Sequence, residues 1–309
     1  MKKGSDIDAS WLYLKIYPES SEEIGQILLS LRSLSLYELK NLFTQFFYVR
    51  YHDPDPHIRV RFKVLSSQKT ILSTRTREAI ENELVGLGIS GFHVLEDLYQ
   101  PETLRYGGEI LMAICEQQFI ISSMLCLDIC TDRETKSYSS RMGIAFHMHY
   151  NLLECYNIDH RRKIELLDRI EESWLNMFCM KSSIGNNLEL KLEIKKRFES
   201  RITPELLCEL SNNLKDKQKD GFLKISFARW KDDNMAIARS IQYLSAKEFN
   251  SKQYLREITT KAHLDEDKRV VYTIVESFIH MTNNRLGIIN LDEAYQASIL
   301  SKIYSLGLI

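Results

Sequence analysis

The segment FFYVRYHDPDPHIRVRFK, residues 46–63, decides the fold of this chain. Its second half alternates between apolar and basic residues, which is the period of two expected of a half-buried strand. The apolar positions are Ile58, Val60 and Phe62, and the basic positions are His57, Arg59, Arg61 and Lys63. Residues 46–51 are aromatic and β-branched and predict a partner strand, while the two prolines of the connector are typical of a turn. We therefore expect a hairpin with one core face and one positively charged face.

A simpler interpretation applies to the basic residues of this hairpin. Charged side chains on a strand commonly face solvent or protect a sheet edge from pairing with another chain. The formal net charge of the whole chain is -1, so there is no overall attraction to nucleic acid or to an anionic membrane. Any anion-binding site must therefore be local.

The rest of the pattern predicts an α+β protein, with a small, mostly antiparallel sheet in the N-terminal third packed with a largely helical C-terminal two-thirds. Strands are expected at 11–17 and 91–99, and helices at 21–31, 36–43 and 67–87. Three-to-four apolar spacing then predicts helices at 109–130, 135–155, 161–180, 187–198, 204–215, 232–244, 265–286 and 291–306. Linkers are expected at 181–186 and 215–221. We interpret residues 1–309 as a single domain, with a sheet-bearing part at 1–108 and a helical part at 109–309.

Composition favours a cytoplasmic protein without cofactor or metal. With 309 residues and 44% hydrophobic residues, the chain can bury an ample core. It has no secretory signal at its start and no run of about 18 apolar residues, so no membrane association is expected. The six cysteines include no CxxC pair, and no GxGxxG or phosphate loop is present. We expect reduced thiols and no metal or nucleotide.

Two further segments carry residues suited to chemistry. In PETLRYGG, residues 101–108, Glu102 and Arg105 are three apart and could form an ion pair, and the paired glycines allow a close backbone approach. In the helix expected at 265–286, a polar stripe carries His280, followed by Asn284 and Arg285. Such a stripe either faces water or presents a proton-transfer group to a cleft.

Taken together, these segments resemble a known family. A Trp-led first strand, HIRVRF, PETLRYGG, the CEQQF segment at 115–119 and HMTNNR at 280–285 look like the C-terminal elimination domain of class I lanthipeptide dehydratases. Free-standing relatives occur in thiopeptide-type bacteriocin pathways. The resemblance covers the chain from about residue 10 onward. One departure is the pair Ser122 and Ser123, where the family commonly has Asp-Ser.

The resemblance implies a lyase of ribosomal peptide natural product biosynthesis. A separate enzyme would use glutamyl-tRNA to esterify Ser or Thr of a precursor peptide, and this chain would eliminate the glutamate to leave dehydroalanine or dehydrobutyrine. The implied partners are the precursor peptide, with its leader and glutamylated core, and the tRNA-dependent glutamylation enzyme. Direct contact with nucleic acid is not expected, since the region that uses tRNA is absent from the resemblance.

The resemblance also implies five site residues: Arg59, Arg61, Glu102, Arg105 and His280. Arg59 and Arg105 would hold the glutamyl group, because a guanidinium grips a carboxylate with two donors. Arg61 would assist, Glu102 would orient an arginine, and His280 would serve as acid or base. We expect these residues to converge on one hollow of carboxylate size.

Two alternatives stay open from the sequence. Some free-standing relatives are pyridine synthases, which join two dehydroamino acids by a formal cycloaddition and expel the leader peptide. Those relatives look to have lost much of the arginine, glutamate and histidine set that is present here. The second alternative is a non-catalytic module that binds the leader peptide as an added strand.

Overall fold

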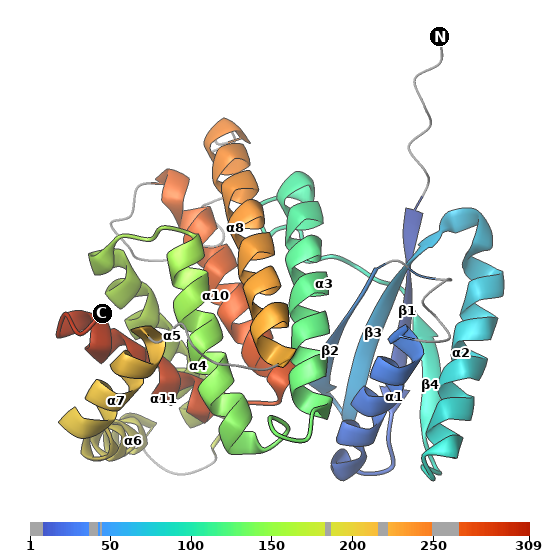
Figure 1. Cartoon of the computed structure of the whole chain (residues 1–309), viewed down its shortest axis with the longest axis horizontal. Coiled ribbons are helices and arrows are strands. Elements are labelled where there is room, and N and C mark those ends of the chain that lie inside the picture. The colour runs from blue at the N-terminus through green and yellow to red at the C-terminus, as the bar shows by residue number, and fades with distance from the viewer. Residues whose placement is uncertain (1–8, 37–42, 44, 183–186, 216–221, 249–265) are drawn as a thin grey trace. The chain divides into compact units, whose positions relative to one another are not determined.

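Two compact units make up the protein, shown in the computed structural model as an α+β fold (Figure 1). The structure describes residues 9–36, 43, 45–182, 187–215, 222–248 and 266–309. The first unit comprises Met1–Glu102, Glu116–Ser137 and Asn284–Leu286, and the second comprises Thr103–Cys115, Tyr138–Asn283 and Gly287–Ile309. The α+β class is confirmed, whereas the single domain with parts 1–108 and 109–309 stays a prediction.

A four-stranded antiparallel sheet forms the centre of the first unit. Its strand order is β2-β3-β1-β4. The strands are β1 Ala9–Tyr17, β2 Phe46–His52, β3 Pro56–Leu65 and β4 His93–Asp97. Strands β2 and β3 are the hairpin expected from the sequence, and Tyr48 lies opposite Val60 in its register. The predicted hairpin is therefore confirmed.

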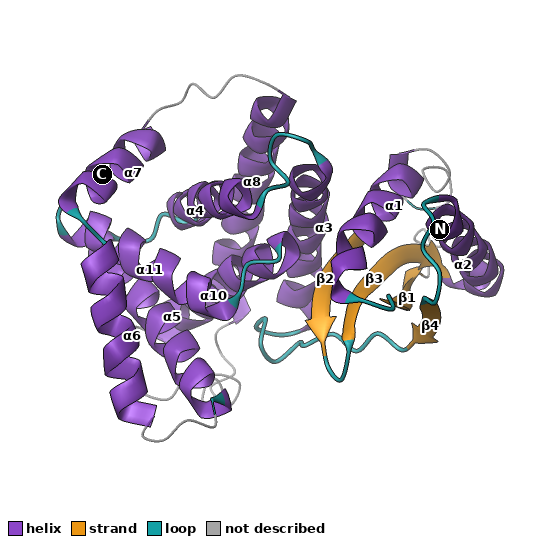
Figure 2. Cartoon of the chain, turned by 90° about the horizontal axis from the view of Figure 1, so that it is seen from below, coloured by secondary structure: helices purple, strands orange, loops and turns teal. Residues whose placement is uncertain are grey.

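The apolar face of the sheet packs against α1 (Ile24–Leu36) and α2 (Lys69–Gly86). Figure 2 shows both helices on one side of the strands. The paired side chains Leu12 with Phe62, Leu14 with Val60 and Ile16 with Ile58 are all buried. Each fully buried aliphatic side chain contributes about 1.5–3 kcal/mol, so this face holds the hairpin rigidly in place.

The opposite face of the sheet carries the basic residues, and we call it the arginine face. It consists of His57, Arg59, Arg61 and Lys63 of β3 together with residues of β1: Lys15, Tyr13 and Trp11 lie opposite Arg59, Arg61 and Lys63 in the register, and Tyr17 stacks on His57. His57 is 0% exposed and Arg61 is 8% exposed. The interpretation of these residues as a solvated strand face is therefore wrong, because two of the four are buried.

Side chains, rather than another strand, cover the outer edge of β2. The backbone N–H of Tyr48 donates to Ser123 Oγ at 3.1 Å, and Arg285 Nε donates to the Tyr48 carbonyl at 3.0 Å. The amide of Asn284 makes two bonds to the backbone of Arg50, accepting from its N–H at 2.9 Å and donating to its carbonyl at 2.8 Å. This edge is thereby closed to pairing with another chain.

Helix α3 (Glu109–Thr131) contributes residues to both units. It is long and apolar enough to cross a membrane by composition alone, yet 61% of its most apolar window is buried inside the protein. Phe119 of α3 packs on Phe47 of the sheet, with ring centroids 5.5 Å apart. These contacts are those of a core helix in a folded domain.

Helices form the second unit, and most of them match the predicted ranges. They are α4 Tyr138–Cys155, α5 His160–Lys181, α6 Asn187–Arg201, α7 Pro204–Lys215, α8 Phe222–Glu248, α10 Glu266–Leu286 and α11 Asn290–Ser305. Helix α8 extends well beyond the predicted 232–244. The prediction was too short because charged residues interrupt the apolar spacing of this helix. The helix expected at 36–43 and the linkers at 181–186 and 215–221 lie largely outside the described residues.

Candidate active site

Arg59 is held by two neighbours on the arginine face. Its Nε donates to His57 Nε2 at 3.0 Å, and its guanidinium carbon lies 3.3 Å from the centroid of the Tyr51 ring. Among the residues that the structure describes, no carboxylate lies within 4.0 Å of the Arg59 guanidinium. The half-buried cation is thus oriented by an imidazole and an aromatic ring rather than by an ion pair.

His57 is the neutral support of Arg59. An arginine N–H can only donate, so His57 Nε2 must accept and the ring proton must lie on Nδ1. That proton points at the Asp55 carbonyl, 2.8 Å away. The ring stacks on Tyr17 with a centroid distance of 4.3 Å. Burial lowers the pKa of His57, and the neighbouring positive charge of Arg59 acts in the same direction.

Arg61 is enclosed by aromatic rings. Its guanidinium carbon lies 4.3 Å from the ring centroid of Tyr13, 4.8 Å from that of Tyr99 and 5.2 Å from that of Phe47. Burial lowers the pKa of Arg61, although an arginine remains charged at any physiological pH. Aromatic faces stabilise such a cation by roughly 0.5–2 kcal/mol each. Arg61 is therefore a buried positive charge within the arginine face.

Glu116 of α3 is a buried acid of the first unit. It accepts a hydrogen bond from Trp11 Nε1 at 3.2 Å. Burial raises the pKa of Glu116, while hydrogen bonds and the positive charges of Lys63 and Arg61 oppose that shift. The sequence singled out the CEQQF segment only by resemblance, and the structure shows that its glutamate packs with the Trp11 end of the arginine face.

Arg105 lies in the loop before α3 and is fixed by α10. Its Nε donates to Ser277 Oγ at 3.0 Å, and Ser277 is buried one turn before His280. Gly107 has a φ of 78°, and a Cβ there would lie 2.7 Å from side-chain atoms of Val270 and Leu111. A larger residue is excluded by both conformation and space. The glycine therefore lets the loop carrying Arg105 pack tightly on the helices.

His280 of α10 pairs with Glu293 of α11. Its Nδ1 lies 3.0 Å from Glu293 Oε1 and 3.3 Å from Oε2. The ring of Trp174 on α5 packs against the imidazole, with centroids 4.7 Å apart and planes tilted by 40°. Arg105 and His280 are thus connected within the second unit through one turn of α10.

Glu293 was missed by the sequence reasoning, although a signal for it existed. It lies on the apolar stripe of α11 that continues through Ala297, Leu300 and Tyr304. A glutamate at such a position is buried with the stripe, and it is 1% exposed here. A buried carboxylate requires a partner, and a histidine on the preceding helix was an available one.

The five residues expected from the sequence divide between the two units. Arg59, Arg61 and Glu102 belong to the first, and Arg105 and His280 belong to the second. Their convergence on one hollow, and the ion pair between Glu102 and Arg105, stay predictions. Glu102 itself is an exposed loop residue.

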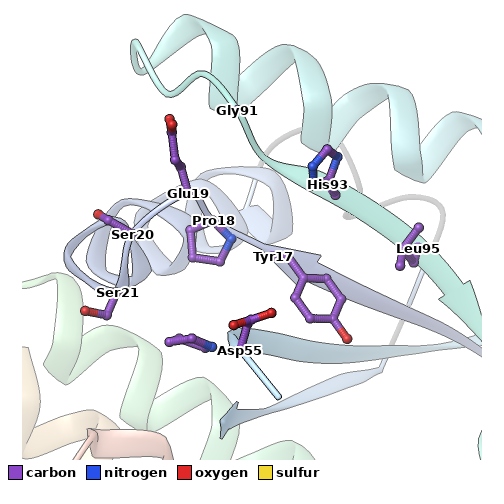
Figure 3. A pocket seen from close by; sticks show the side chains of 10 residues that line it. Tyr17, Pro18, Glu19, Ser20, Ser21, Asp55, Gly91, His93 and Leu95 are labelled. Carbon is purple, nitrogen blue, oxygen red and sulfur yellow. The ribbon is translucent and has the colours of Figure 1, made fainter. Parts of the chain in front are cut away.

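A hollow of about 610 Å³ lies in the first unit at the end of β1 (Figure 3). Its lining includes Tyr17, Glu19, Asp55, His93 and Leu95, and none of the five expected residues. The carboxylates of Glu19 and Asp55 would repel an anionic glutamyl group, so this hollow is a poor candidate for the proposed chemistry. Among described residues, no group of three or more metal-ligating side chains is found.

The sequence profile of the lantibiotic biosynthesis dehydratase C-terminal family matches residues 11–304. This chain belongs to that family. The match covers β1 through most of α11, so both units are parts of the family domain. Arg59, Arg61, Arg105, His280 and Glu293 all fall within it.

Individual proteins similar to this chain include a nisin biosynthesis protein, a lantibiotic dehydratase and a pyridine synthase. The nisin biosynthesis protein NisB of Lactococcus lactis subsp. lactis is 25% identical over 277 residues, which cover 89% of this chain and 23% of NisB. The tRNA-dependent lantibiotic dehydratase MibB from Microbispora sp. 107891 matches the whole chain over 29% of its own length, with a TM-score of 0.58 and 16% identity. The pyridine synthase TbtD from thiomuracin biosynthesis matches 96% of this chain and 98% of its own, with a TM-score of 0.60 and 12% identity. The chain thus spans about a quarter of NisB, and the structural matches concern the fold.

Proposed function

We propose that this protein eliminates glutamate from O-glutamylated serine and threonine residues of a ribosomally made precursor peptide, leaving dehydroalanine or dehydrobutyrine. The observation that carries the proposal is Arg59, a half-buried cation oriented by His57 and Tyr51 without a described carboxylate partner. Family membership supports the same reaction class. The protein would act as a lyase in the cytoplasm, where precursor peptides are made.

The reaction suits an anion-binding residue combined with a proton-transfer residue. The Cα–H bond breaks, its electron pair forms the Cα=Cβ bond, and the Cβ–O bond breaks to release glutamate as a carboxylate. Because glutamyl-tRNA carries glutamate through its α-carboxyl, the leaving group is the α-carboxylate, and its reference pKa of about 3.3–3.7 makes it a far better leaving group than hydroxide. The remaining barrier is removal of the weakly acidic Cα proton, which builds negative charge on the peptide carbonyl. A preorganised donor can stabilise such charge by about 3–4 kcal/mol.

Arg59 and Arg61 would supply positive charge in the first unit. Arg59 has its Nε engaged by His57, so its two terminal nitrogens can form a fork for a carboxylate. Arg61 is enclosed by Tyr13, Tyr99 and Phe47 and would act through its field rather than by contact. The aromatic surroundings exclude water and thereby strengthen both effects.

In the second unit, Arg105 would bind the leaving glutamate and His280 would transfer the proton. The bond of Arg105 to Ser277 fixes it near His280, and Glu102 would orient Arg105. A positioned acid or base typically contributes about 10² to 10⁴ in rate. Histidine is suited to the role because its reference pKa of about 6.5 lies close to physiological pH.

The partners follow from the substrate. The protein would require a precursor peptide with its leader and its glutamylated core, and a separate tRNA-dependent enzyme that attaches the glutamate. MibB is described as tRNA dependent, whereas direct contact of this chain with tRNA is not part of the proposal.

The test is to incubate a glutamylated precursor peptide with the purified protein and to follow the peptide by mass spectrometry. The expected result is loss of each glutamyl adduct, release of free glutamate and appearance of a dehydroamino acid. Tight binding without any mass change would support a leader-binding module instead.

The second candidate is a pyridine synthase, favoured by the match over 98% of the TbtD chain. It predicts ring formation and expulsion of the leader from a peptide that already contains two dehydroamino acids. Offering both substrates in parallel separates the two activities. The arginines and His280 favour elimination.

A further inference from the structure

Glu293 is a buried carboxylate whose position on α11 gives it contact with His280. Both of its oxygens lie within 3.3 Å of His280 Nδ1. Glu293 has 1% of its side chain exposed, whereas His280 has 24%. Solvent therefore reaches the imidazole of His280, whereas the carboxylate of Glu293 is buried.

The burial of Glu293 is unfavourable by itself. Desolvation raises the pKa of Glu293, and the neighbouring His280 acts in the opposite direction. An alanine or leucine at this point would continue the apolar stripe of α11 without that cost. The first turn of a helix tolerates a negative charge because the helix dipole is positive there. Side-chain hydrogen bonds with Asn283 and Trp174 also lower the pKa of Glu293, so the inward carboxylate is held by several groups, of which His280 is the one that can transfer a proton.

The contact fixes which nitrogen of His280 is reactive. An ionised carboxylate can only accept hydrogen bonds, so the proton of neutral His280 must lie on Nδ1. The lone pair of the imidazole is then on Nε2, on the side away from Glu293. Nε2 is therefore the nitrogen of His280 that can accept a proton.

Neighbouring groups keep this arrangement in place. The Trp174 ring packs on the imidazole and restricts its rotation. Two other charged groups next to this part of α10 have their own partners, since Glu276 of α10 pairs with Arg169 of α5 at 2.9 Å and Arg105 bonds to Ser277. Glu293 is thus the acid that directly contacts His280 among the described residues.

We propose that Glu293 is a positioning residue for His280, holding the imidazole in the Nδ1–H tautomer so that Nε2 can remove or return the proton during elimination. The inference rests on the proposed function of His280 as the proton-transfer group. Glu293 acts through the histidine and does not touch the substrate.

The test uses the isosteric variant Glu293→Gln. A glutamine can donate to Nδ1 as well as accept from it, so the constraint on the tautomer is lost while the shape is kept. We expect kcat for elimination to fall about 10- to 10²-fold with KM unchanged, as is typical when a group that orients a functional histidine is lost. Glu293→Asp, which keeps an acceptor-only group on a shorter stem, should lie between the variant and the wild type.

A second measurement needs no substrate. Nitrogen NMR of isotope-labelled histidine should show Nδ1–H for neutral His280 in the wild type and a mixture of tautomers in Glu293→Gln. Asp168→Asn is the matched control, because Asp168 is an acid of α5 that accepts from Ser301 of α11 at 2.5 Å, two turns beyond Glu293 on the same helix. It should leave both kcat and the tautomer unchanged.

The outcomes separate the two proposals. Nε2–H as the resting tautomer of wild-type His280, or a kcat in Glu293→Gln within twofold of wild type, would overturn the positioning role. A different result would refute the elimination reaction alone: the wild-type protein leaves the glutamylated peptide intact, while NMR still shows Nδ1–H in the wild type and a mixture of tautomers in Glu293→Gln. The effect of Glu293 on the tautomer of His280 would then stand without the proposed reaction.

Discussion

The hairpin around Arg59 and the pair of helices α10 and α11 around His280 differ in the partners that they give to a basic side chain. In the hairpin, Arg59 and Arg61 are oriented by a neutral histidine and by aromatic rings, and neither forms an ion pair with a described carboxylate within 4.0 Å. In the helix pair, His280 faces the buried carboxylate of Glu293. The comparison teaches that a residue's partner decides its use: a cation supported by neutral groups can bind an anion, and a histidine paired with an acid can transfer a proton.

The largest effect should come from removing the proton-transfer group. His280→Ala should reduce the rate of glutamate elimination by roughly 10² to 10⁴, with glutamylated peptide accumulating in a mass-spectrometric assay. His160→Ala, at an exposed position of α5, is the matched control. If His280→Ala turns over the substrate as fast as His160→Ala does, the helix pair has no part in the chemistry.

The next largest effect should come from the hairpin. Arg59→Ala should slow elimination by about 10² to 10³, and Arg59→Lys should not restore it because an ammonium lacks the guanidinium fork. Lys63→Ala removes a cation from the same strand face and should change the rate little. If Arg59→Ala and Lys63→Ala slow elimination equally, the hairpin contributes only a general positive charge and Arg59 has no specific role.

Asn284 lies four residues after His280 on α10 and should affect stability rather than rate. Its amide satisfies the N–H and the carbonyl of Arg50, and leaving such groups unpaired costs about 1–3 kcal/mol. We expect Asn284→Ala to lower the free energy of unfolding in urea by about 2 kcal/mol. Asn212→Ala, on an exposed face of α7, should change it by less than about 0.5 kcal/mol. A stable Asn284→Ala protein with impaired kcat would reverse this assignment.

The support beneath Arg59 should have a smaller effect than Arg59 itself. His57→Phe keeps a ring against Tyr17 but removes the acceptor for Arg59 Nε. The loss of one hydrogen bond of about 1 kcal/mol should lower kcat/KM about five- to tenfold. His52→Phe, at the exposed end of β2, serves as the control. Unchanged kinetics for His57→Phe would show that the Tyr51 ring alone orients the arginine.

The smallest effect concerns acid stability in the second unit. Burial lowers the pKa of His149 to about 3, from about 6.5 in an unfolded chain. Between these values the unfolded state binds the proton and the folded state does not, so the free energy of unfolding falls as the pH is lowered. His149 should account for about 1 kcal/mol between pH 6 and pH 5. His149→Gln should flatten the pH dependence by that amount, and an identical slope in both proteins would contradict the assignment.

Local patterns allowed much of the fold to be predicted. The alternation at 57–63 gave the hairpin and its two faces, because a strand's side chains alternate in a fixed way. Most helices of the second unit followed from apolar spacing, and α8 was underestimated where charges such as Lys231 and Asp232 interrupt its stripe.

The partners of the site residues were beyond the reach of local patterns. The sequence gives no distance between His280 and Glu293, although they are only 13 positions apart, because the turn between α10 and α11 decides whether they meet. Likewise, HIRVRF indicated two arginines on one strand face, and only the structure places Arg61 among Tyr13, Phe47 and Tyr99 while Arg59 bonds to His57. The Asn284 and Arg285 pair looked like part of a cleft, whereas it closes the edge of β2.

The closed edge of β2 has a consequence for synthesis of the chain. Asn284 follows Arg50 by 234 residues, so a ribosome completes the hairpin long before it delivers Asn284 and Arg285, which cover part of the outer edge. During that interval the nascent sheet presents unpaired backbone groups to its surroundings, a state that invites self-association. Loss of residues 284–286 should therefore appear first as poor soluble yield in the producing cell, and a chaperone that binds extended segments should relieve it.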